Sequence, residues 1–158
     1  MTPKAIKLIF LFAFIFTTGV FALEANAQSI TGSIGNGTVK RGAATRATVV
    51  LNIPGGLHVN SNRPNNEYAI PTVVSVTSRE ARVSPVSYPR GVSKKFSFSD
   101  QPISVYEGRP SFGFNVTVPA NFKGNVVRVR AVVRYQACND EVCFPPKTQE
   151  VTLSARVE

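Results

Sequence analysis

Short segments in which apolar and polar residues alternate are the feature that most constrains the fold of this chain. The segments 112–118, 127–135 and 151–157 have an apolar residue, or Ala, at every second position, and Val49, Leu51 and Ile53 repeat the pattern. A period of two is typical of β-strands that bury one face and expose the other. No segment after residue 27 sustains the 3.6-residue period of an amphipathic helix. The sequence therefore predicts an all-β protein.

Turn-forming residues divide the chain into short strands at regular intervals. Weaker strand patterns lie at 73–77, 82–86 and 94–98, and turn signals such as Pro54-Gly55-Gly56 and Lys123-Gly124-Asn125 lie between strands. About seven to nine strands, roughly 8–12 residues apart, are typical of an immunoglobulin-like antiparallel β-sandwich, with a β-barrel as the alternative. The chain has no Trp and its two cysteines are only five positions apart, so the disulfide core of antibody domains is absent.

The first 27 residues have the pattern of a signal peptide. Two lysines precede an uncharged stretch over 8–23, and Ala25-Asn26-Ala27 is a small-x-small cleavage site. As a helix the uncharged stretch would be about 24 Å long, short of a hydrocarbon core of ~30 Å. We therefore expect cleavage of residues 1–27 and export of one domain, 28–158, to the periplasm or beyond, where disulfides persist. An uncleaved membrane anchor is the alternative.

Charge and histidine content exclude several function classes. The chain has 18 Lys and Arg against 9 Asp and Glu, but the basic residues are scattered and never form a run of five. This pattern favours a solvated basic surface over a nucleic-acid site. The one histidine, His58, excludes any scheme that needs two imidazoles from one chain, and we interpret it as a packing or surface residue.

The two cysteines lie at the end of a predicted hairpin. Four residues separate Cys138 from Cys143, and they begin with the turn-forming pair Asn139-Asp140, which makes a normal hairpin loop. Residues opposite each other in an antiparallel ladder have Cα atoms about 4.5–5.5 Å apart, which suits a disulfide. A loop this short stabilises the fold by only ~2 kcal/mol in the chain-entropy model. A redox-active bond and a static structural bond both remain open at this position.

The residues around the cysteines limit other uses of the pair. A zinc or copper site is disfavoured, because two thiolates need two further ligands and only His58 is at hand. Phe144-Pro145-Pro146 follows the second cysteine. The two prolines fix φ and lack an N–H, so they end the strand ladder and form a stiff apolar shoulder that suits docking. A plain strand terminator is the alternative interpretation.

The cysteine hairpin resembles that of a known family. Tyr135-Gln136-Ala137-Cys138, a short acidic loop and Cys143-Phe144-Pro145-Pro146 are similar to the active-site hairpin of the N-terminal periplasmic domain of the thiol:disulfide interchange protein DsbD, and the segments 56–64 and 67–72 are similar to it as well. The resemblance implies an immunoglobulin-like domain that carries electrons without a cofactor or metal. It also implies that Cys143 forms the mixed disulfide with partners and that Cys138 resolves it.

The same resemblance implies a cap loop whose aromatic residue shields the cysteine pair. The candidate is Val105-Tyr106-Glu107-Gly108, with Tyr106 as the covering ring and Glu107 beside it. The loop between the cysteines is a residue shorter than in the best-known members of the family.

The implied activity is that of a thiol:disulfide oxidoreductase of the protein-disulfide reductase type. Its implied partners are thioredoxin-like redox proteins and disulfide-bearing periplasmic proteins. Full interchange proteins continue into a membrane domain and a thioredoxin domain that this sequence lacks, so we expect a separate membrane protein as electron donor. We expect no nucleic acid partner and no membrane insertion after cleavage. The alternative function is an exported interaction or adhesion module with an inert disulfide.

Overall fold

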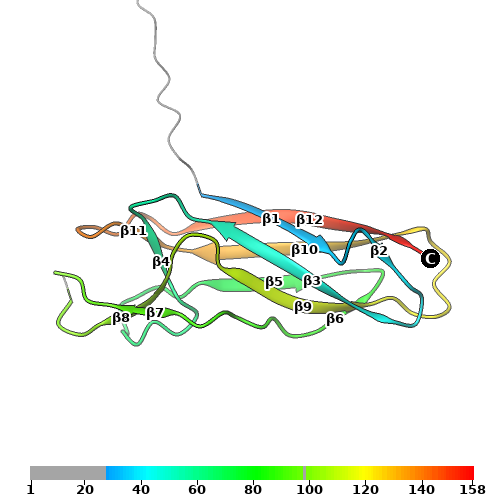
Figure 1. Ribbon diagram of the computed structural model, residues 1–158, viewed down its shortest axis with the longest axis horizontal. Helices are drawn as coiled ribbons and strands as arrows, with labels where there is room; N and C mark the ends of the chain where they lie inside the picture. Colours follow the sequence, from blue (N-terminus) through cyan, green and yellow to red (C-terminus); the bar gives the residue numbers. More distant parts are fainter. Residues whose placement is uncertain (1–27, 98) are drawn as a thin grey trace, which may run out of the picture.

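The computed structural model describes residues 28–97 and 99–158 (Figure 1). This part of the chain forms twelve strands and no helix, and it therefore contains no helix long and apolar enough to cross a membrane. The predicted signal peptide, 1–27, lies outside the described residues. The strands are β1 Ser29–Ile34, β2 Thr38–Val39, β3 Ala44–Asn52, β4 His58–Asn60, β5 Val73–Thr77, β6 Arg82–Val83, β7 Val92–Lys94, β8 Ile103–Tyr106, β9 Ser111–Thr117, β10 Val126–Tyr135, β11 Ala137–Cys138 and β12 Lys147–Val157.

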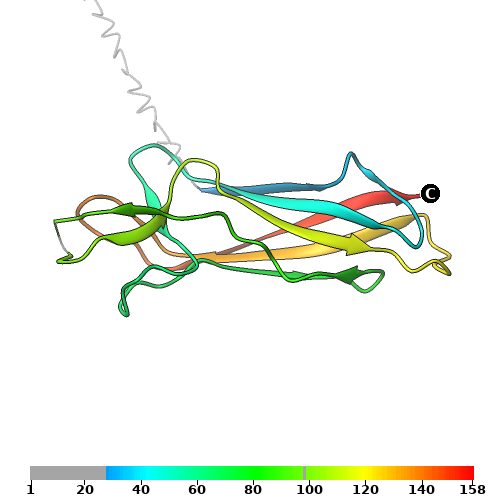
Figure 2. The ribbon, with the colours of Figure 1, turned by 60° about the horizontal axis from the view of Figure 1, so that its bottom comes forward.

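The strands form three sheets of four strands each. Two sheets, in the orders β1-β3-β9-β6 and β2-β12-β10-β5, run along the long axis of the molecule, while the third, β11-β4-β8-β7, lies at one end (Figures 1 and 2). All strand pairs are antiparallel except β12 with β2. The predicted immunoglobulin-like β-sandwich is confirmed, and it carries a small additional sheet at one end.

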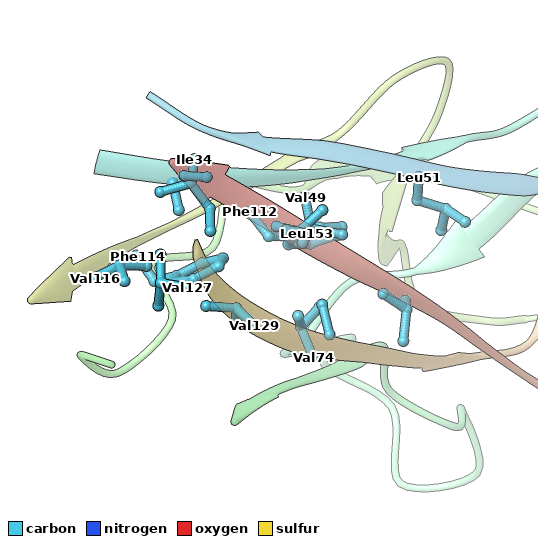
Figure 3. Close-up of a cluster of buried hydrophobic side chains, with 14 of the residues drawn as sticks. Ile34, Val49, Leu51, Val74, Phe112, Phe114, Val116, Val127, Val129 and Leu153 are labelled. Atoms are coloured by element: carbon cyan, nitrogen blue, oxygen red, sulfur yellow. The ribbon is translucent and has the colours of Figure 1, made fainter. Parts of the chain in front are cut away.

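The main core lies between the two long sheets. Every second residue of β10, from Val127 to Tyr135, is fully buried, as its alternating sequence predicts. Figure 3 shows side chains of both sheets meeting in this core, including Val49 and Phe112 from one sheet and Val129 and Leu153 from the other. Burying an aliphatic or Phe side chain of this size contributes about 1.5–3 kcal/mol. The sandwich is therefore a rigid base for the sheet at its end.

The end sheet is built from strands that the alternating pattern does not reveal. All three residues of β4 are buried, and β8 buries three of its four residues, so neither strand alternates between a buried and an exposed face. The predicted strand at 94–98 is wrong, because β7 ends at Lys94 and the chain then leaves the sheet. Phe96 instead packs with Ile103 and Val105 in a second, small core.

The hairpin that carries the cysteines passes from a long sheet to the end sheet. β10 pairs with β12 as far as Tyr135 and Lys147, and the next strand, β11, pairs with β4 instead. Pro145 and Pro146 lie directly before β12 and have no N–H to extend its ladder. The hairpin therefore separates from the sandwich at the prolines, and its tip lies beside β4.

Candidate functional site

The cysteines form a disulfide at the tip of the hairpin. Cys138 and Cys143 are bonded, and their Cα atoms are 3.9 Å apart, closer than the 4.5–5.5 Å expected from the sequence. The loop between them is tightly hydrogen-bonded, since Oδ1 of Asn139 accepts the backbone N–H of Glu141 at 2.9 Å and of Val142 at 2.7 Å. The hairpin thus brings both sulfurs to one end of the molecule.

The two cysteines differ in their access to solvent. Cys138 is 1% exposed, whereas Cys143 lies in the exposed tip beside Val142 and Phe144. A thiolate that attacks a disulfide must reach one of its sulfurs. A protein partner can therefore approach Cys143 but not Cys138 without a change in the structure.

His58 lies directly opposite Cys138 on the neighbouring strand. The two residues are partners in the β4–β11 pair, and His58 is only 2% exposed. Burial lowers the pKa of His58 below its ordinary value of 6.5; the carboxylates of Glu107 and Asp140 act in the opposite direction, and Lys94 adds to the lowering. The interpretation of His58 as a packing residue agrees with this burial, whereas its position opposite Cys138 could not be predicted from the sequence.

An aromatic ring from the segment between β7 and β8 covers His58. The rings of Phe96 and His58 are stacked, with centroids 4.3 Å apart and an angle of 18° between their planes. The same segment contacts the cysteine loop, since Oγ of Ser97 lies 3.5 Å from the carbonyl oxygen of Asp140. The pattern at 94–98 predicts a strand and therefore does not identify Phe96 as a residue of the site. An aromatic residue within a run of Lys and Ser was the available signal.

Tyr106, the residue predicted to cover the disulfide, packs in the main core. The residue ends β8, is 3% exposed and packs edge-to-face on Phe112 with ring centroids 5.8 Å apart. Its hydroxyl lies 2.7 Å from Oδ1 of Asn62 and 3.1 Å from the carbonyl oxygen of Pro89. The register of β8 against β4 turns this ring into the main core.

Glu107, the second residue predicted for the cap, lies on the surface after β8. Its carboxylate forms an ion pair with Nζ of Lys94 at 2.6 Å. This pair lies close enough to His58 for both charges to influence the pKa of the imidazole. Glu107 is therefore near the site. The ring that covers His58, however, comes from the segment between β7 and β8 and not from the segment of Glu107.

The flanking residues predicted from the sequence divide into two groups. Gln136 holds the hairpin, because its Nε2 donates to the carbonyl oxygen of Phe144 at 3.1 Å, and Phe144, Pro145 and Pro146 are exposed beside Cys143. Tyr135 instead points into the main core, where burial raises the pKa of its phenol and no described residue pairs with its hydroxyl.

A cavity adjoins the exposed cysteine. It has a volume of about 270 Å³, and its lining includes Cys143, Gln136, Asn60 and Tyr68. Within residues 28–97 and 99–158 there is no group of three or more His, Cys, Asp and Glu residues that could hold a metal ion. The chemistry that the described residues offer here is that of a disulfide with one accessible sulfur.

Comparison with known proteins supplies a family for this arrangement. The family model described as "Thiol:disulfide interchange protein DsbD, N-terminal" matches residues 35–155. No curated protein sequence matches the chain.

The solved structures that match this chain include two N-terminal domains. The reduced DsbD N-terminal domain of Neisseria meningitidis is 19% identical, with 70% of this chain and 80% of that chain covered and a TM-score of 0.43. The N-terminal periplasmic domain of ScsB from Proteus mirabilis is 12% identical, with 80% of this chain and 44% of that chain covered and a TM-score of 0.48.

Proposed function

This chain belongs to the family of DsbD N-terminal domains, and on that premise we propose that it passes electrons between a thioredoxin-like protein and substrate disulfides in the periplasm. The family is one of thiol:disulfide exchange domains, and the chain has the cysteine pair that such exchange requires. The observation that carries the proposal is the asymmetry of this pair: Cys143 is exposed at the hairpin tip and Cys138 is buried behind it.

In the oxidised protein, exchange begins at Cys143. The thiolate of a reduced partner attacks Sγ of Cys143, a new bond joins the two proteins, and the Cys138–Cys143 bond breaks with its electron pair on the sulfur of Cys138. A second thiolate of the partner then attacks the partner's own sulfur in the mixed disulfide and releases Cys143 as a thiolate. Two electrons have moved to the domain, and the partner leaves with a disulfide.

The reduced protein passes the same two electrons onward. Cys143 attacks a substrate disulfide and releases one substrate sulfur as a thiolate. Cys138 then attacks Sγ of Cys143 in the mixed disulfide, which restores the intramolecular bond and releases the second substrate sulfur. In this scheme Cys143 contacts partners and Cys138 resolves the intermediate, and the difference in exposure supports that division.

Trapping of the mixed disulfide tests this function. In Cys138→Ala the exposed thiol can attack a partner but no second cysteine resolves the product, so we expect covalent complexes with thioredoxin-like proteins that disappear on reduction. Cys143→Ala is the matched control and should trap none, because Cys138 is buried. Equal trapping by the two variants, or none by either, would refute the proposed exchange.

The reduction potential separates exchange from the alternative of an inert bond in an exported interaction module. Structural disulfides lie below about −300 mV, and exchange-active pairs between roughly −270 and −120 mV. We expect the Cys138–Cys143 pair in the second range, measured by equilibration with a glutathione or dithiothreitol buffer.

The proposed location depends on export by residues 1–27. If a signal peptidase removes this segment, the protein isolated from the periplasmic fraction begins at Gln28. N-terminal sequencing of that fraction checks the cleavage directly, and a chain that keeps residues 1–27 would support the membrane-anchored alternative.

A further inference from the structure

Three chemically active side chains lie in one row across the end sheet. Cys138 is the bridge partner of Cys143 on one side and the strand partner of His58 on the other. Residues directly opposite each other in an antiparallel pair project from the same face, with Cβ atoms about 4.5–5.5 Å apart. The imidazole of His58 and the sulfur of Cys138 therefore share a face, and His58 lies on the side of Cys138 away from Cys143.

This end of the row is shielded from solvent. Cys138 and His58 are both buried, and Phe96, itself 4% exposed, stacks on the imidazole. A thiolate in such surroundings is unfavourable, since burial disfavours the charged form of a thiol. Every turn of the proposed exchange either creates a thiolate at Cys138 or needs one there. The buried sulfur therefore requires a nearby group that can take or return its proton.

We infer that His58 is this group and exchanges a proton with the sulfur of Cys138, an inference that rests on the proposed function. When the reduced domain resolves a mixed disulfide, the imidazole takes the proton from the thiol of Cys138 as its sulfur bonds to Sγ of Cys143. The substrate sulfur leaves with the electron pair of the broken bond, and the imidazolium then loses its proton to solvent. In the opposite direction, His58 takes up a proton from solvent and gives it to the thiolate of Cys138.

The charges around His58 are compatible with this cycle. Burial lowers the pKa of the imidazole, so at pH 7 it is neutral and able to accept a proton. The groups that act on it are Glu107 after β8, Lys94 in β7 and Asp140 in the cysteine loop. The two carboxylates stabilise the imidazolium once it forms, and the ion pair of Lys94 with Glu107 moderates their effect. The surroundings of His58 therefore favour the neutral imidazole before the reaction and still stabilise the imidazolium that forms during it.

The test follows the two halves of one reaction by stopped flow. Reduced protein is mixed with a chromogenic nitrobenzoate disulfide, which releases one coloured thiolate when Cys143 attacks and a second when Cys138 resolves. We expect His58→Gln to slow the second phase roughly 100-fold at pH 7, within the usual range for a lost general base. The first phase should change by less than about threefold. Phe122→Leu is the matched control: Phe122 packs against the main core and does not belong to the site, so its second phase should stay within about threefold of the parent.

The pH profile of the parent protein gives an independent readout. With His58 as base, the second-phase rate rises with loss of the imidazole proton and becomes level above the pKa of His58, which lies below 6.5. Without such a base, the rate rises tenfold per pH unit at least as far as the ordinary thiol pKa of about 8.5, because burial disfavours the thiolate. A continuous rise of the rate in the parent protein overturns the inference, and this readout does not depend on how well the variant folds. A second phase in His58→Gln with the rate and pH profile of the parent also overturns it. If the trapping experiment fails but the rate is level above the pKa of His58, the proposed exchange with protein partners is refuted and the role of His58 is not. The two results are independent because the small disulfide needs no protein partner.

Discussion

Removal of the ring that covers His58 should open access to the buried cysteine. The change is Phe96→Ala, made in a Cys143→Ala background so that Cys138 is the only thiol. Phe96 belongs to the small core with Ile103 and Val105 and has no place in the main core. The substitution should therefore weaken the docking of the 95–102 segment and leave the sandwich folded.

The expected size of the effect follows from the contacts of the ring. Burial of a Phe side chain contributes about 1.5–3 kcal/mol, and a stacked aromatic pair about 0.5–1.5 kcal/mol more. Loss of both would weaken docking by about 2–4.5 kcal/mol, which raises the open population roughly 30- to 1,600-fold at 1.4 kcal/mol for each factor of ten. Alkylation of Cys138 by iodoacetamide should accelerate by a factor in this range, if opening and closing are faster than the chemical step.

The control for this experiment is Phe122→Ala. Phe122 packs partly buried against the main core and is not part of the small core around Phe96. Its truncation should reduce global stability without changing the alkylation of Cys138. An acceleration of less than about threefold in Phe96→Ala, or an equal acceleration in Phe122→Ala, would show that the Phe96 ring does not control access to this sulfur.

Three further substitutions test the fold and the titration of its buried groups. Phe112→Ala removes a fully buried ring that packs edge-to-face with Tyr88 and Tyr106. Urea unfolding should show that the free energy of unfolding falls by about 3–5 kcal/mol. Ser111→Ala, at the exposed neighbouring position, is the control and should change it by no more than ~0.5 kcal/mol. Tyr135→Phe deletes a buried hydroxyl that no described residue pairs with, so the free energy of unfolding should rise by about 1 kcal/mol; a loss would indicate an unseen partner. Because the pKa of His58 is lowered in the folded protein, the unfolded chain binds more protons below pH 6.5, and stability should fall as the pH is lowered from 6.5 toward 5. This decrease should be smaller in His58→Gln, and equal decreases in the two proteins would contradict the lowered pKa.

Local patterns were sufficient for the long strands. β9, β10 and β12 each bury one face against the sandwich core, so their side chains alternate and the sequence reveals them. The hairpin position of the cysteines followed from the same strands and from the turn residues between them. The family resemblance of the cysteine hairpin agrees with the match over 35–155.

The end sheet could not be predicted by the same reasoning. β4 is buried on both faces and β11 has only two residues, so neither produces an alternating pattern. The same limitation applies to the two aromatic residues: Tyr106 packs in the main core, and Phe96 stacks on His58. Both are aromatic residues near turns, and only the pairing of β8 with β4 determines which ring enters the main core.

The sequence by itself determined the all-β class, the hairpin and the closeness of its two sulfurs, because alternation, turn residues and a short loop are properties of neighbouring residues. Only the tertiary structure decided that Cys138 is buried, that Cys143 is exposed and that His58 stands opposite Cys138 under Phe96. The physical reason is that burial and cross-strand neighbours arise when segments far apart in the chain pair and pack. The chemical difference between the two cysteines is therefore a product of the fold.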